Sequence, residues 1–197
     1  NVRVAFSEKH KEWIGRTIPD IVKRGPGGAA PVRDQAAWIL KNQARGDVQV
    51  IAEEMSEPDV RQLITAPDMV FGSDSSVHYR GLGRPHPRGA GTFPRIFAEF
   101  VRDEKLLTLE DAVHRATGLA AEIFGLPERG LIREGYWADI VIFDPGRLQD
   151  RATFADPWKP PEGIAGVVVN GSVAVRGTKL TGALAGRPVL RSAGGAL

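Results

Sequence analysis

The stretch that decides the fold is Gly125–Asp144, which reads GLPERGLIREGYWADIVIFD. Before it, apolar residues recur at helical spacing, and Leu109–Phe124 is predicted to be a helix that Thr108 caps. After it, β-rich segments such as Ala138–Phe143 follow one another, and the pattern indicates no further helix. We therefore expect an α/β part at residues 1–125 and a small β domain at residues 126–197.

Downstream, Val167–Val175 encloses the dipeptide Asn170-Gly171, the strongest short-range signal for a β-hairpin. Upstream, short apolar segments alternate with segments of helical spacing. Strands are expected at 1–6, 48–51 and 69–72, and helices after Thr17, at 32–45, from Ser56 and at 93–104, with a break at Gly25–Gly28. Such alternation favours a parallel α/β architecture. Three strands are too few to close a (β/α)8 barrel, which needs eight.

Composition bounds the function classes. The chain has 197 residues, of which 42% are hydrophobic and 25% charged, with a net charge of +2. It has no dense basic run and no apolar stretch of membrane-spanning length, so neither nucleic acid nor a membrane is the expected partner. Nothing at the start resembles a signal peptide, and a cytoplasmic location is expected. The absence of cysteine excludes thiolate metal ligands and a Cys nucleophile within this stretch.

Three residues are candidates for a site. Asp74 follows the predicted buried strand at 69–72, and α/β barrels place catalytic residues at that end of a strand. The alternative, which we weigh equally, is that Asp74 only opens a turn. Arg88 lies on the same long loop and can clamp a carboxylate, although an exposed loop arginine is the simpler reading. Ser7 ends the first predicted strand and is the weakest candidate.

The segments together resemble the amidohydrolase superfamily, and within it the N-acyl-D-amino-acid deacylases, or D-aminoacylases. The stretch Gly125–Asp144 is similar to the junction between the last barrel helix of these enzymes and their C-terminal β domain. Two further stretches carry the subfamily likeness: Met55–Arg61 with Gly72–Asp74, and Arg84–Arg88 with Gly91–Arg95. The likeness is good over residues 47–190 and looser over residues 1–46.

The resemblance implies the fold and the roles of the candidates. The chain would be the C-terminal part of a metal-dependent (β/α)8 TIM barrel, followed by strands of a small β-sandwich domain. Asp74 would be a metal ligand and the general base, and Arg88 would bind the carboxylate of the substrate. Ser7 is expected to be a further substrate-binding residue from its position at the end of the first predicted strand. The H-x-H pair that such enzymes carry on the first strand has no counterpart here. We therefore expect one or two zinc ions whose ligands lie mostly outside this chain.

The expected activity is zinc-dependent hydrolysis of an N-acyl-D-amino acid to a carboxylate and a free D-amino acid. The expected partners are that small molecule and the N-terminal part of the same enzyme. Two alternatives remain open at this point. One is a cyclic-amide amidohydrolase similar to hydantoinases and dihydroorotases, and the other is a non-catalytic interaction fragment.

Overall fold

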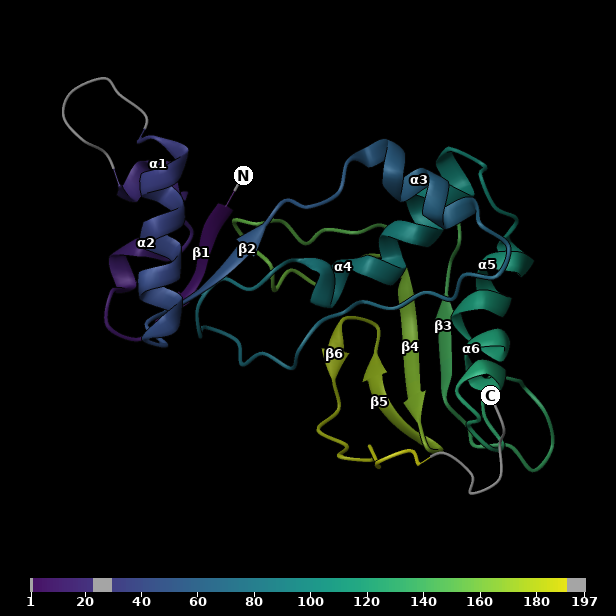
Figure 1. Cartoon of the computed structure of the whole chain (residues 1–197). Coiled ribbons are helices and arrows are strands. Elements are labelled where there is room, and N and C mark those ends of the chain that lie inside the picture. The colour runs from purple at the N-terminus through teal and green to yellow at the C-terminus, as the bar shows by residue number, and fades with distance from the viewer. Residues whose placement is uncertain (1, 23–29, 191–197) are drawn as a thin grey trace. The chain divides into compact units, whose positions relative to one another are not determined.

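The structure is a computed structural model that describes residues 2–22 and 30–190. Its contacts divide the chain into two compact units (Figure 1). The first unit consists of Asn1–Val60, Asp74–Gly89 and Ala152–Lys159, and the second of Arg61–Ser73, Ala90–Arg151 and Pro160–Leu197. Each unit is therefore assembled from segments that are distant in the sequence.

The first unit is built on a two-stranded sheet with helices against it. Its elements are β1 (Val2–Ser7), η1 (Lys11–Trp13), α1 (Ile18–Ile21), α2 (Val32–Ala44) and β2 (Val48–Ala52). The side chains of Val4, Ile18 and Val48 form its buried core, and Trp13 and Trp38 pack against them. Thr17 caps α1 by accepting the N–H of Asp20, as the sequence predicts.

The pairing of β1 with β2 corrects the expected parallel sheet. The two strands run antiparallel, with Val2 opposite Ala52 and Ser7 opposite Val48. One crossover helix returns the chain so that the next strand runs parallel. Here two helices, α1 and α2, separate the strands, so the chain reverses once more before β2 begins (Figure 1). The predicted break at Gly25–Gly28 lies outside the described residues.

The second unit places helices beside a four-stranded sheet (Figure 1). α3 (Glu57–Thr65) and α4 (Arg88–Arg95) each begin in the first unit and end in the second. The remaining elements are η2 (Ile96–Asp103), α5 (Leu109–Ala116), α6 (Gly118–Ile123), β3 (Ile140–Phe143), β4 (Ile164–Val169), β5 (Ser172–Arg176) and β6 (Lys179–Leu180). Phe100, which is 2% exposed, is the largest buried side chain of this unit.

The sheet of the second unit confirms the predicted hairpin. Its strand order is β3-β4-β5-β6, and every neighbouring pair is antiparallel. Asn170 and Gly171 join β4 to β5 with φ angles of 46° and 81°, the left-handed values that this dipeptide tolerates. The mixed α/β character expected from the sequence is therefore present. The predicted boundary at residue 125 and the sandwich partner of this sheet stay predictions.

Three predicted elements differ from the structure. The helix expected at 93–104 begins earlier, at Arg88, and runs without a break from α4 into the π-helix η2; Pro94, which has no N–H to donate, lies directly before this change. The helix expected at 109–124 is broken between α5 and α6 by Thr117, whose ψ is −84°. The strand expected at Met69–Gly72 is absent, and these residues pair with no described strand. An unpaired strand would leave its backbone N–H and C=O groups without partners. Within the described residues, no helix has the length and apolar character needed to cross a membrane.

Candidate active site

The loop Asp74–Arg88 in the first unit is closed at its base by its own end residues. The Nη2 atom of Arg88 lies 2.9 Å from Oδ2 of Asp74. Beside this ion pair, a Cβ placed on Gly89 would lie 2.8 Å from Oγ of Ser75. A side chain at this position would require the hydroxyl of Ser75 to turn away. The loop is therefore of the compact kind whose ends meet and which often carries function.

Asp74 has an unusual backbone and an open side chain. Its φ is 47°, a left-handed value that aspartate adopts more readily than most residues. Its side chain is 88% exposed. The carboxylate is thus presented to solvent, with one oxygen held by Arg88, and can act on a ligand that arrives from outside this unit.

His86 fixes the backbone that carries Arg88. Its Nδ1 accepts the N–H of Arg88 at 3.0 Å, which requires an unprotonated Nδ1. Burial lowers the pKa of His86 below its ordinary value of 6.5, and the charge of Arg88 adds to this effect. The ring of Phe154 meets that of His86 edge-on, with centroids 5.0 Å apart. The environment therefore favours the neutral imidazole that this hydrogen bond needs.

The same loop is anchored on β1. The N–H of Arg84 donates to the carbonyl of Ala5 at 2.7 Å. Gly83, with φ at 73°, comes so close to that strand that an added Cβ would lie 2.7 Å from the same carbonyl oxygen. The backbone of the loop is therefore seated directly on the strand, and the sheet positions Arg88 through it.

A cavity of about 380 Å³ lies between this loop and the strands of the first unit. Its volume falls within the range of small-molecule sites. Its lining is mixed: Phe6, Val50, Ile51 and Leu82 are apolar, and Gln49, Ser75, Ser76, His78 and Tyr79 carry polar groups. Arg88 lines it as well. The structure thus brings two of the three predicted residues together at one place: Arg88 in the wall, and Asp74 paired with it.

Ser7, the third candidate, lies elsewhere in the packing. It is fully buried, and its Oγ accepts the N–H of His10 at 3.0 Å. That hydrogen bond holds the turn between β1 and η1. A role for Ser7 in substrate binding stays a prediction, and the observed contact is a structural one.

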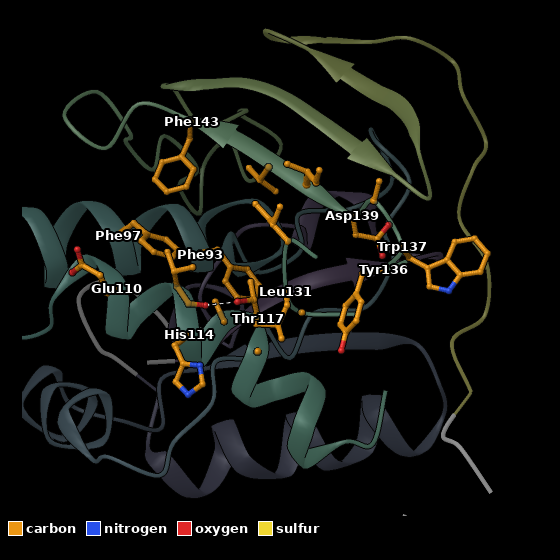
Figure 2. Close-up of a pocket in the computed structure, with 18 of the residues that line it drawn as sticks. Phe93, Phe97, Glu110, His114, Thr117, Leu131, Tyr136, Trp137, Asp139 and Phe143 are labelled. Atoms are coloured by element: carbon orange, nitrogen blue, oxygen red, sulfur yellow. Dashed lines mark hydrogen bonds between the residues drawn. The ribbon is translucent and has the colours of Figure 1, made fainter. Parts of the chain in front are cut away.

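A larger cavity, of about 800 Å³, lies in the second unit between the helices and β3 (Figure 2). Phe97 from η2 faces Phe143 from β3, with ring centroids 5.5 Å apart. Among the polar residues that line this cavity, Asp139 accepts hydrogen bonds from the guanidinium of Arg129 and from the N–H of Asn170. This cavity is apolar and has no nucleophile with a neighbouring base, so we do not assign the chemistry to it.

The described residues include single potential metal ligands but no cluster of them. Across residues 2–22 and 30–190, no three His, Asp or Glu side chains come together in a way that can hold a metal ion. Three of the four histidines have ring contacts in the first unit: His10 stacks on Trp13, His78 meets Trp158, and His86 meets Phe154. Asp74, whose carboxylate is exposed, is the residue of this chain that we expect to be a metal ligand.

Residues 30–175 match the sequence pattern of the amidohydrolase family. The chain belongs to the amidohydrolase family. It is 45% identical over 171 residues to the N-acyl-D-aspartate deacylase of Alcaligenes xylosoxydans xylosoxydans, an alignment that covers 85% of this chain and 31% of that protein. The chain thus spans about a third of the length of such relatives.

Solved structures of this family agree with the fold. The crystal structure of a D-aminoacylase superposes with a TM-score of 0.83 at 35% identity, covering 96% of this chain and 38% of that one. The N-acyl-D-glutamate deacylase of Bordetella bronchiseptica, solved with zinc and a phosphonate inhibitor, gives a TM-score of 0.73 at 35% identity, covering 90% and 35%. Both similarities extend through the two units of this amidohydrolase chain.

Sequence reasoning did not single out three residues that shape the site. These are His86, which holds the backbone of Arg88, and Gly83 and Gly89, which allow the close approaches. The spacing His86-Pro87-Arg88 carried a signal, because a histidine two residues before a loop arginine can accept its N–H. The two glycine contacts are with residues distant in sequence and left no local signal.

Proposed function

We propose that this chain is the C-terminal part of an N-acyl-D-amino-acid deacylase, a hydrolase that releases a carboxylate and a free D-amino acid. The observation that carries the proposal is the 2.9 Å pair between Arg88 and Asp74 beside the cavity of the first unit. An acid–base group next to a carboxylate-binding cation suits a substrate whose scissile amide lies near a carboxylate. Relatives whose names describe this reaction support it.

In this proposal Arg88 orients the substrate. A guanidinium binds a carboxylate through two parallel hydrogen bonds, which fixes both distance and direction. The α-carboxylate of an N-acyl amino acid is separated from the amide carbon by only a few bonds. Holding it at Arg88 therefore places the amide within reach of Asp74, and such positioning contributes to rate by lowering the entropic cost of the reaction.

Asp74 is the proposed proton carrier. One of its oxygens faces Arg88, and its side chain is otherwise exposed. It would accept the proton of the attacking water and return it to the leaving amine.

Zinc would be held mainly by residues outside this chain. The described residues do not assemble a metal site, and Asp74 offers one carboxylate. When bound, zinc supplies a water of lowered pKa and polarises a carbonyl group. The remainder of the protein would also complete the (β/α)8 barrel of which residues 1–125 form the last part.

The open edge of β3 supports a proposal about where that remainder packs. Within the described residues β3 pairs on one side only, with β4. Val141 and Ile142 of β3 are 53% and 54% exposed, and the apolar cavity of about 800 Å³ lies next to this strand. Exposed apolar residues beside an unpaired strand edge suit a protein–protein contact. We propose that the N-terminal part of the same enzyme covers β3 and forms the second layer of the sandwich.

Replacement of Asp74 tests the proposal. In the full-length protein, Asp74→Asn should reduce kcat for N-acetyl-D-amino acids by about 1,000-fold or more, since the amide keeps the shape but cannot accept the proton. Asp68→Asn is the matched control: this exposed carboxylate a few residues earlier should leave kcat unchanged. Ordinary turnover by Asp74→Asn would remove Asp74 from the mechanism.

A further inference from the structure

We propose that the cavity of the first unit selects N-acyl-D-amino acids with neutral, apolar side chains over those with acidic side chains. The inference rests on the proposed function and adds the substrate class to it. Names of similar proteins span D-aminoacylase, D-aspartate and D-glutamate deacylases, so relatedness leaves this choice open. The charges around the cavity distinguish between apolar and acidic substrate side chains.

The cavity has one fixed charge to offer. Of the described residues that line it, Arg88 alone is permanently charged. The α-carboxylate of the substrate uses that guanidinium in the proposed function. A second carboxylate, on the substrate side chain, would then face apolar residues such as Phe6, Val50 and Leu82. The polar residues Gln49, Ser75 and Ser76 also line the cavity, but they are neutral and offer no ion pair.

Three cations of the first unit are engaged elsewhere. The guanidinium of Arg3 lies over the ring of Phe154 and donates to the carbonyl of Gly15 at 3.1 Å. The guanidinium of Arg84 lies against the backbone of Gly15. The ammonium of Lys11 lies 5.2 Å from the ring centroid of Phe6. Although Phe6 lines the cavity, these three cations do not, so none meets a ligand inside it.

Two histidines line the cavity, and neither is a permanent cation. The ring of His78 meets that of Trp158 edge-on, with centroids 6.3 Å apart. Burial lowers the pKa of His86, and its Nδ1 is already occupied by the N–H of Arg88. A neutral imidazole can donate one hydrogen bond from Nε2 but does not neutralise a carboxylate. An acidic side chain would lose its hydration without gaining an ion pair, whereas an apolar one gains by burial.

The test compares substrates of the full-length protein. We expect kcat/KM for N-acetyl-D-leucine to exceed that for N-acetyl-D-aspartate and N-acetyl-D-glutamate by at least about 100-fold. Equal or better hydrolysis of either acidic substrate would overturn this inference and leave the proposed function intact. Failure to hydrolyse any of the three would overturn the proposed function, and the inference with it.

A charge placed in the wall provides the second arm. Gln49, an exposed residue of β2 opposite Phe6, lines the cavity. Gln49→Lys should raise the ratio of kcat/KM for N-acetyl-D-glutamate over N-acetyl-D-leucine by about tenfold or more. The control Gln43→Lys adds the same charge on α2, away from the cavity, and should leave the ratio as it is. A folded Gln49→Lys protein with an unchanged ratio would contradict the proposal.

Discussion

The guanidinium of Arg88 and the carboxylate of Asp74 lie 2.9 Å apart and close the base of one loop. Both side chains are substantially exposed, at 42% and 88%, and exposed pairs contribute little to stability. Both groups are therefore accessible to a ligand. The substrate carboxylate would compete with Asp74 for the same guanidinium.

Truncation of Arg88 should impair binding more than chemistry. For Arg88→Met in the full-length protein we expect KM to rise about 10- to 100-fold with a smaller change in kcat, because the lost contact is made before and during the reaction. Arg80→Met, an exposed arginine of the same loop, serves as the control and should keep both constants. Steady-state kinetics decides; an unchanged KM for Arg88→Met would exclude the clamp.

Acidification should loosen the loop through His86. The pKa of His86 is lowered in the folded state, so its stabilising effect is complete above the unfolded value of 6.5 and is lost as pH falls through the lower folded value. Protonation removes the acceptor for the N–H of Arg88 and places a second positive charge beside it. Denaturant unfolding measured between about pH 8 and pH 5 should show a decline that includes this contribution.

The variant His86→Asn isolates that contribution, because its amide oxygen can accept the same N–H and does not titrate. Relative to the unmodified protein, its unfolding free energy should fall less steeply on acidification. Identical pH slopes for the two proteins would show that His86 does not couple protonation to folding.

The seat of the loop on β1 can be tested with a matched pair of glycines. Gly83 and Gly81 have similar φ angles, 73° and 86°. An added Cβ would lie 2.7 Å from the Ala5 carbonyl oxygen at Gly83 but meets nothing within 4 Å at Gly81. Gly81→Ala therefore reports the backbone cost alone, about 1–2 kcal/mol. Gly83→Ala should cost about 1–3 kcal/mol more by overpacking. Equal losses of unfolding free energy would mean that the contact with β1 is absent.

Arg115 should matter for the stability of the second unit. Its side chain is 6% exposed, Nη2 lies 2.8 Å from Oδ2 of Asp111, and Nη1 donates to the carbonyls of Ile64 and Ala66. Arg115→Met leaves the buried carbonyl of Ile64 and the half-buried carbonyl of Ala66 without this donor, and should lower the unfolding free energy by about 1–3 kcal/mol. The exposed pair of Arg151 with Glu162 provides the control, and Arg151→Met should have no measurable effect. A small loss for Arg115→Met would show that water replaces its contacts.

The sequence by itself determined the local elements and the family. Capping by Thr17 and Thr108, the Asn170-Gly171 hairpin and the periodicity of α2 are set by residues within a few positions of one another, so they can be read directly. The stretch Gly125–Asp144 carried the family resemblance for the same reason. Asp74 and Arg88 were also identified from their local segments.

The tertiary structure alone decided how distant segments meet. The antiparallel register of β1 and β2, the contact of Gly83 with Ala5 and the approach of Ser75 to Gly89 each join residues whose local patterns do not refer to one another. The same holds for the engaged cations around the cavity, because whether Arg3 or Arg84 reaches a ligand depends on packing and not on residue type. Residue types supplied the charges, and only the three-dimensional arrangement left Arg88 alone among them in the cavity wall.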